Sequence, residues 1–115
     1  MSQSIRKGTR DRAAAFAGLF AALGDDTRLS LVVRLCRGEP QSITQLTSGS
    51  KLTRQAVTKH LRVLEGVGIV RGVRVGRENL FEFDPGPVDA MKEYLESVSA
   101  GWDRKLERLK ALVEE

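Results

Sequence analysis

The chain has little of several residue types on which protein chemistry often depends. Its 115 residues include one cysteine, Cys36, and one histidine, His60. A lone cysteine cannot form a disulfide within the chain, and this pair cannot supply the ligands of a zinc site. No apolar run approaches the ~18 residues of a membrane span. The first residues, MSQSIRKGTRDR, have no apolar stretch after their basic residues and so do not have the pattern of a secretory signal. We therefore expect a cytoplasmic protein without membrane association, metal or other cofactor.

The groupings of an enzyme active site are missing as well. The sequence shows no nucleophile with an adjacent base, no glycine-rich phosphate loop, and no paired carboxylates placed for a cleft. A length of 115 residues allows one domain with a modest core. We predict a single-domain protein that is not an enzyme.

What the chain does have is a local excess of positive charge. Residues 50–80 hold seven basic and two acidic side chains, a net charge of +5, whereas the remainder of the chain sums to −1. A charge concentrated in one segment indicates a polyanionic partner for that segment.

Hydrophobic spacing predicts four helices before this basic segment ends. Residues 1–10 have no periodicity, so we expect a flexible basic arm there and a helix over 11–23. Asp25 is placed to cap a second helix, Ser42 a short third helix, and Thr53 a fourth. In the second helix, the apolar stripe is expected to contain Leu29, Val32, Val33 and Cys36.

The fourth helix has two distinct faces at helical spacing. Ala56, Val57, Leu61 and Leu64 form an apolar face, and the polar face carries Gln55, Thr58, Lys59 and Arg62. After Gly66 and Gly68 the period becomes two, which predicts a β-hairpin with Ile69, Arg71, Val73 and Val75 on one face. The turn is expected at Gly76, Arg77, Glu78 and Asn79.

The last predicted helix, residues 88–113, repeats apolar residues every three or four positions in the manner of a coiled coil. A chain this short has little with which to cover such a stripe, so we expect the first and last helices to form a homodimer. The expected interface residues are Phe16, Leu19, Phe20, Met91, Leu95, Val98, Trp102, Leu106 and Leu109.

The order of these elements indicates a mostly α-helical winged helix-turn-helix, α-α-α-α-β-β-α, over residues 11–115. In this arrangement the helix after the turn enters the DNA major groove. Arginine and glutamine side chains read base edges, whereas lysine, threonine and the wing arginines suit phosphates or the minor groove. The predicted DNA-binding residues are Thr53, Arg54, Gln55, Thr58, Lys59, Arg62, Arg74 and Arg77.

These residues resemble a known family. The stretch from about residue 14 to 85, with its D-x-T-R-L opening of the second helix and R-x-N-L-F-E-F second wing strand, is similar to the ArsR/SmtB repressors. The resemblance implies a homodimeric transcriptional repressor that binds double-stranded DNA at an inverted-repeat operator. It also implies release from DNA when an effector binds.

The sequence departs from the metal-sensing members of that family. Their third helix begins with a Cys-x-Cys box, where this chain has Ser42 and Thr44, and its last helix has neither histidine nor cysteine. We therefore predict no metal site and leave the effector open as a small molecule or a protein. A winged-helix protein-interaction module is the alternative function, although a net charge of +5 is unlike the centre of a protein interface.

Three single residues have two interpretations each. For His60 we favour packing or a phosphate contact over catalysis or metal binding, because no second ligand lies at useful spacing. Cys36 is interpreted as an inert core thiol, with a redox sensor as the alternative. Trp102 is interpreted as interface packing, with a ligand-pocket cap as the alternative.

Overall fold

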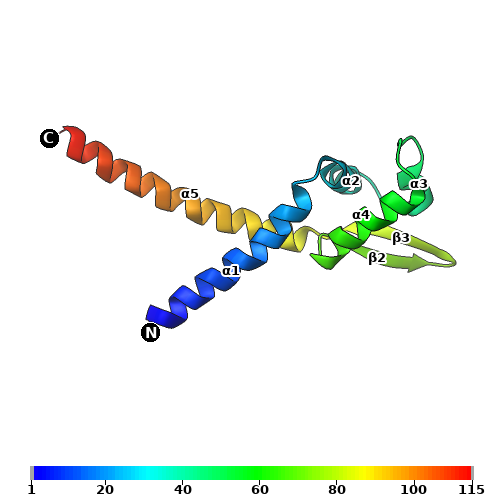
Figure 1. Cartoon of the computed structure of the whole chain (residues 1–115), viewed down its shortest axis with the longest axis horizontal. Coiled ribbons are helices and arrows are strands. Elements are labelled where there is room, and N and C mark those ends of the chain that lie inside the picture. Colours follow the sequence, from blue (N-terminus) through cyan, green and yellow to red (C-terminus); the bar gives the residue numbers. More distant parts are fainter. Residues whose placement is uncertain (1, 115) are drawn as a thin grey trace. The chain divides into compact units, whose positions relative to one another are not determined.

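The computed structural model describes residues 2–114, and side chains from residue 13 to 113. This part of the chain forms five helices and one small three-stranded sheet, and Figure 1 labels the helices and the two longer strands. The elements follow in the order α1 (Ser2–Leu23), α2 (Asp26–Arg37), β1 (Gln41–Ser42), α3 (Ile43–Thr47), α4 (Arg54–Gly66), β2 (Val70–Val75), β3 (Glu78–Phe83) and α5 (Pro85–Glu114). The chain divides into two compact units, one ending at Pro85 and the other beginning at Gly86.

Side-chain caps fix where the helices of the first unit begin. Asp25 accepts a hydrogen bond from the N–H of Arg28 at 3.0 Å, and Thr53 accepts from the N–H of Ala56 at 3.1 Å. Ser42 and Gln45 form a reciprocal capping box at the start of α3. The three predicted caps are confirmed, so the helix-turn-helix starts where the sequence indicated.

The core of the first unit lies between the helices and the base of the sheet. Val57, Leu61 and Leu64 of α4 are fully buried, which confirms the apolar face predicted for that helix. The other buried apolar side chains are Leu19, Ala22, Leu31, Val32, Leu35, Leu46, Ile69, Val70 and Phe81. Burial of one face of α4 leaves its polar face outward.

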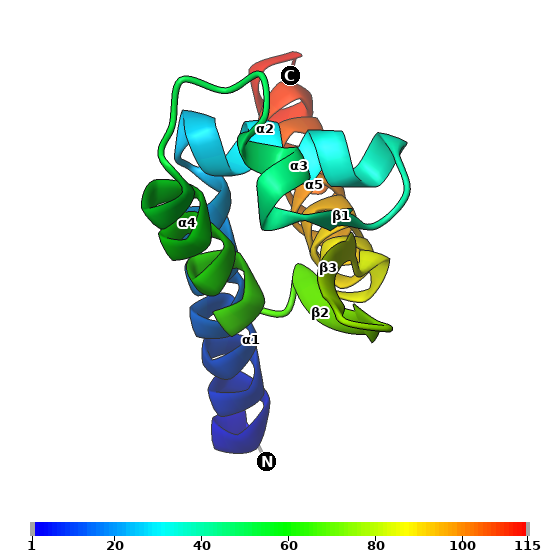
Figure 2. The same ribbon diagram turned by 90° about the vertical axis from the view of Figure 1, so that its right-hand side faces the viewer.

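The sheet contains one strand more than the sequence predicted. β2 and β3 form the expected antiparallel hairpin, with Val70 opposite Phe83 and Val75 opposite Glu78. The two-residue strand β1 pairs with the other edge of β3, Gln41 opposite Phe81 and Ser42 opposite Leu80. Figure 2 shows β1 leading directly into α3, so the wing is joined by backbone hydrogen bonds to the start of the helix-turn-helix.

Two predicted helix boundaries were wrong. α1 begins at Ser2 rather than at residue 11. Met1 and the side chains through residue 12 lie outside the described part, so the flexibility of the basic arm stays a prediction. α5 begins at Pro85 rather than at Val88. Proline is tolerated in the first turn of a helix, where its missing N–H has no intrahelical partner to lose.

The predicted apolar stripe of α2 was also wrong in part. Val32 is buried, but Leu29 is 46% exposed, Val33 is 39% exposed, and Cys36 is exposed. The buried face contains Leu31, Val32 and Leu35 instead. Both sets satisfy helical spacing around Val32, so periodicity alone did not decide which one faces the core. The interpretation of Cys36 as a core thiol is therefore corrected.

The alternation predicted for the wing holds only partly. Ile69 is buried, but so is its neighbour Val70, while Val75 is 57% exposed near the hairpin tip. The buried side chains of the two strands, Val70 and Phe81, lie in the half of the hairpin nearer its base. The tip therefore has no buried face, and its side chains do not alternate between buried and exposed.

Candidate nucleic-acid interface

The outer face of α4 presents the polar side chains that the sequence placed there. Arg54, Gln55, Lys59 and Arg62 are exposed, together with the capping residue Thr53. Thr58 is half-buried, and its hydroxyl donates to the carbonyl of Arg54 at 2.7 Å. The Thr58 hydroxyl is thus committed as a donor within the helix but keeps an acceptor lone pair for a ligand.

The wing brings two further arginines near this helix. Gly76 has a φ of 63°, a left-handed conformation that glycine adopts without steric cost, and Arg77 follows it at the hairpin tip. The Arg74 Nε donates to the carbonyl of Gly76 at 3.4 Å. Both arginines are exposed, so the tip is a cationic projection.

A groove lies between the start of α4, the start of α3 and the wing. Its volume is about 510 Å³, and Arg54 and Arg77 line it from opposite elements. The remaining lining residues are Ser42, Ile43, Thr44, Gln45, Glu78 and Asn79. Two guanidinium groups with hydroxyl and amide groups around them suit a phosphate oxygen.

A second, smaller groove lies between α4 and the wing. It has a volume of about 300 Å³ and contains Arg62 and Arg74, the other predicted pair from these two elements. Arg62 Nη1 donates to Glu65 Oε1 at 2.8 Å on its rim. The two grooves thus join each arginine predicted on α4 to one predicted on the wing.

Not every arginine in the basic segment is available to a ligand. Arg71 forms ion pairs with Glu82, its cross-strand partner, and with Asp84 at 3.9 Å. The hydrogen bond to Glu82 raises the pKa of Arg71. Among the described side chains of residues 50–80, no ion-pair partner is found for five basic residues, which carry the uncompensated charge: Lys51, Arg54, Lys59, Arg74 and Arg77.

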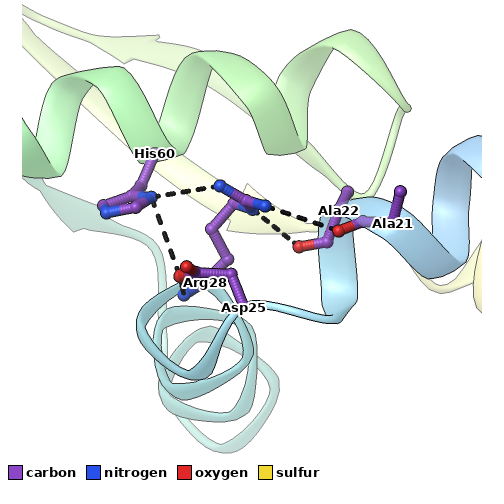
Figure 3. Close-up of polar contacts among 5 residues, drawn as sticks. All are labelled: Ala21, Ala22, Asp25, Arg28 and His60. Atoms are coloured by element: carbon purple, nitrogen blue, oxygen red, sulfur yellow. Dashed lines mark hydrogen bonds and ion pairs between the residues drawn. The ribbon is translucent and has the colours of Figure 1, made fainter.

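His60 points toward the start of α2 rather than to the outer face (Figure 3). Its Nδ1 lies 3.5 Å from Arg28 Nη1 and 4.0 Å from Asp25 Oδ2. The hydrogen bond from the backbone N–H of Arg28 lowers the pKa of Asp25, with partial desolvation opposing it. These contacts agree with the packing interpretation of His60.

The predicted dimer residues differ in how much surface they retain. On α5, Leu95, Val98, Trp102, Leu106 and Leu109 are exposed by 39% to 60%, and Met91 is half-buried. Lys105 Nζ lies 5.3 Å from the Trp102 ring centroid, a cation–π contact. On α1, Phe20 is 40% exposed and Phe16 half-buried, whereas Leu19 is 4% exposed. Leu19 is therefore a core residue with little surface left for a partner.

The predicted DNA-contact residues left out five polar residues that line the larger groove. Ser42 was considered as a helix cap and as a metal-box position, Thr44 only as a metal-box position, and Glu78 and Asn79 only as turn residues, while Gln45 was not considered. The short β1 strand brings α3 against β3 and thereby places these side chains beside Arg54. Within residues 13–113, no three His, Cys, Asp or Glu side chains gather into a possible metal site. None of the described helices has both the length and the apolar character needed to cross a bilayer.

A short helix, a turn at Gly49 with a φ of 77°, an exposed basic helix and a wing define a winged helix-turn-helix DNA-binding protein. Residues 23–73 match the model of a helix-turn-helix domain family. The chain is 32% identical over 90 residues to an HTH-type transcriptional regulator of Bacillus subtilis, YuzN, which covers 73% of this chain and 90% of that protein. It is 37% identical over 67 residues to a transcriptional repressor SmtB homolog of Synechocystis, covering 58% of this chain and 50% of that one.

A solved structure described as an ArsR-like transcriptional regulator from Rhodococcus sp. RHA1 superposes on the chain with a TM-score of 0.83 at 35% identity. The match covers 89% of this chain and 95% of that one. The chain belongs to the ArsR/SmtB family of HTH-type transcriptional regulators. It is a DNA-binding regulator and not an enzyme, which confirms both the predicted class of function and the predicted fold.

Proposed function

We propose that the chain is a homodimeric repressor that binds an inverted-repeat operator through α4 and the wing. The observation that carries the DNA contact is the groove shared by Arg54 and Arg77, because it lets one phosphate be held from the helix and the wing together. The predicted contact set remains Thr53, Arg54, Gln55, Thr58, Lys59, Arg62, Arg74 and Arg77. The relative named an SmtB homolog and repressor supports the direction of regulation.

The proposal assigns dimerisation to α1 and α5. Five apolar side chains of the predicted interface on α5 are at least 39% exposed, although their spacing is that of a buried helical seam. A second copy of the chain would cover this stripe and set two recognition helices about one DNA turn apart, ~34 Å. The effector is a non-metal ligand or a protein, and the location is the cytoplasm, where a bacterial operator lies.

Selection of bound duplexes from a random pool tests the DNA-binding part directly. We expect enriched sequences with two inverted half-sites spaced by about 10 bp, centre to centre. An enriched single half-site would contradict the dimer, and no enrichment at all would favour the alternative of a protein-interaction module.

Point variants then test the contact residues on the selected duplex. Arg54→Ala is expected to weaken binding by about 1–3 kcal/mol and Lys59→Ala to reduce the salt slope by about 1. Arg37→Ala, an exposed arginine at the end of α2, is the control and should bind like wild type. Equal losses in all three variants would mean that charge, and not this face, determines affinity.

Dimerisation is tested separately by sedimentation. Leu106→Glu places a charge in the exposed stripe and is expected to give monomers at concentrations where the wild type is dimeric. Lys92→Glu, an exposed residue outside the predicted interface, should leave the dimer intact. A wild-type chain that sediments as a monomer would refute the proposed dimer.

A further inference from the structure

Arg28 connects three elements of the first unit through one guanidinium group. Its Nε donates to the carbonyl of Ala22 at 2.7 Å, and its Nη2 donates to the carbonyl of Ala21 at 3.4 Å. Both carbonyls belong to the last turn of α1, and that of Ala21 also accepts from the N–H of Gly24 at 3.3 Å. Arg28 itself lies in the first turn of α2, so it joins the end of α1 to the beginning of α2.

The third contact of Arg28 reaches the recognition helix. Its Nη1 lies 3.5 Å from Nδ1 of His60, on the inner side of α4 (Figure 3). A guanidinium donates and never accepts, so this contact is favourable only when Nδ1 carries a lone pair and the proton is on Nε2. The His60 side chain is 23% exposed and its neighbour Leu61 is fully buried, so His60 lies at the edge of the packed face of α4.

Protonation of His60 changes the sign of this contact. A charged imidazolium cannot accept from Arg28 and is repelled by it, while Asp25 Oδ2, 4.0 Å from the same Nδ1, becomes the preferred partner. Among the interactions of the described side chains, Arg28 and Asp25 are the charged groups that face His60. Both come from the start of α2, whereas α1 contributes the two carbonyl oxygens that hold Arg28.

We propose that Arg28 is a positioning residue for DNA binding, which holds α4 against the end of α1 through neutral His60 and loses this contact to Asp25 when His60 is protonated. The inference rests on the proposed DNA contact of α4 but assigns residues outside that contact. DNA affinity therefore decreases on acidification through this contact.

The opposite behaviour follows if His60 touches a phosphate. In that case protonation adds an attractive charge and affinity increases on acidification. The direction of the pH effect thus separates a positioning role from a direct contact. General protonation of the chain also increases affinity, so the comparison must be made with a variant that cannot titrate at this position.

His60→Asn is the matched variant, because its side-chain oxygen can accept from Arg28 near the position of Nδ1 and does not titrate. Binding to the duplex selected from the random pool is measured for full-length wild type and His60→Asn from about pH 8 to about pH 5.5. We expect the affinity of wild type to fall relative to His60→Asn by roughly three- to tenfold, the worth of one net hydrogen bond. Identical profiles, or a relative increase for wild type, would overturn the proposal.

Arg28→Lys tests the other partner, because lysine keeps the charge but lacks the planar fork that serves two carbonyls and an imidazole together. We expect weaker binding at about pH 8 and no remaining acid-dependent difference from an Arg28→Lys, His60→Asn double variant. Arg37→Lys is the control at an exposed arginine of the same helix. A purely structural role of Arg28 would lower stability and leave the pH profile as in wild type, which would contradict the inference.

The tautomer of His60 gives a readout that needs no DNA. Because the chain has one histidine, its imidazole nitrogens are assigned without ambiguity in a spectrum of ¹⁵N-labelled wild type. We expect the proton on Nε2 in the neutral ring, and a proton on Nδ1 would overturn the contact with Arg28. If no duplex binds at any pH, the proposed function fails and this role with it. A flat profile with intact binding refutes only the role of Arg28.

Discussion

Arg62 and Glu65 form an ion pair of 2.8 Å, one turn apart on the outer side of the recognition helix. The Arg62 side chain is 66% exposed, so solvent weakens this pair, and a phosphate can compete with Glu65 for the guanidinium. The pair would therefore weaken, without abolishing, the DNA contact that is proposed for Arg62.

Replacing Glu65 should make Arg62 more available to DNA. We expect Glu65→Gln to increase affinity for the selected duplex by about two- to fivefold, in line with the worth of an exposed ion pair. Binding assays with Arg62→Ala complete the cycle, since Glu65→Gln should have little effect once Arg62 is absent. Glu39→Gln, at an exposed glutamate outside the interface, controls for a general change in charge. An equal increase in that control would reject the specific competition.

The wing tip should not tolerate a side chain at its glycine. Gly76 has a φ of 63°, and alanine in this left-handed region costs roughly 1–2 kcal/mol. We expect Gly76→Ala to lower the free energy of unfolding by about that amount in urea titrations. Gly66→Ala is the matched control, because Gly66 lies in α4 with open space where a Cβ would be, and alanine favours a helix. Unchanged stability in Gly76→Ala would mean that the turn adopts another conformation.

The start of α2 should make stability depend on acid. The pKa of Asp25 is lowered in the folded state, so the ionised carboxylate stabilises the fold at neutral pH, and this contribution is lost as pH falls through the lowered pKa. Asp25→Asn keeps a capping side chain but cannot ionise. We expect thermal unfolding to show wild type more stable at neutral pH and the two proteins converging as pH falls through the lowered pKa of Asp25. A difference that does not change with pH would assign the effect to cap geometry instead.

The exposed thiol of Cys36 should react without unfolding. Partial desolvation raises the pKa of Cys36, with Arg37 opposing it, so little thiolate forms at neutral pH. We expect a thiol reagent to label the native chain more slowly than a free cysteine peptide, with a rate that increases as pH rises. Cys36→Ser provides the blank. Labelling that requires denaturant would restore the core interpretation that the structure has corrected.

Local chemistry predicted much of the fold, because some signals are complete within a few residues. The caps Asp25, Ser42 and Thr53 could be found from sequence, since each satisfies an N–H three residues ahead. Features that depend on partners far away in the sequence could not be predicted in this way. The exposure of Cys36 depends on which face of α2 meets the rest of the core, and both candidate faces have helical spacing.

The candidate site shows the same division. The outward direction of Arg54 and Lys59 follows from the burial of Val57 and Leu61 on the same helix. The groove that joins Arg54 to Arg77 depends on pairing between strands far apart in sequence. The triple contact of Arg28 was equally hidden, because its partners lie 6, 7 and 32 residues away.

The pairing of β1 with β3 limits how this regulator can be re-engineered. If residues 70–83 were replaced by the wing of another protein, Gln41 and Ser42 would pair with a foreign strand. Ser42 also caps the first turn of α3. A chimera that imports another wing should therefore import the matching two residues before α3. Without them, a transplanted hairpin that folds well by itself would still approach DNA at the wrong angle.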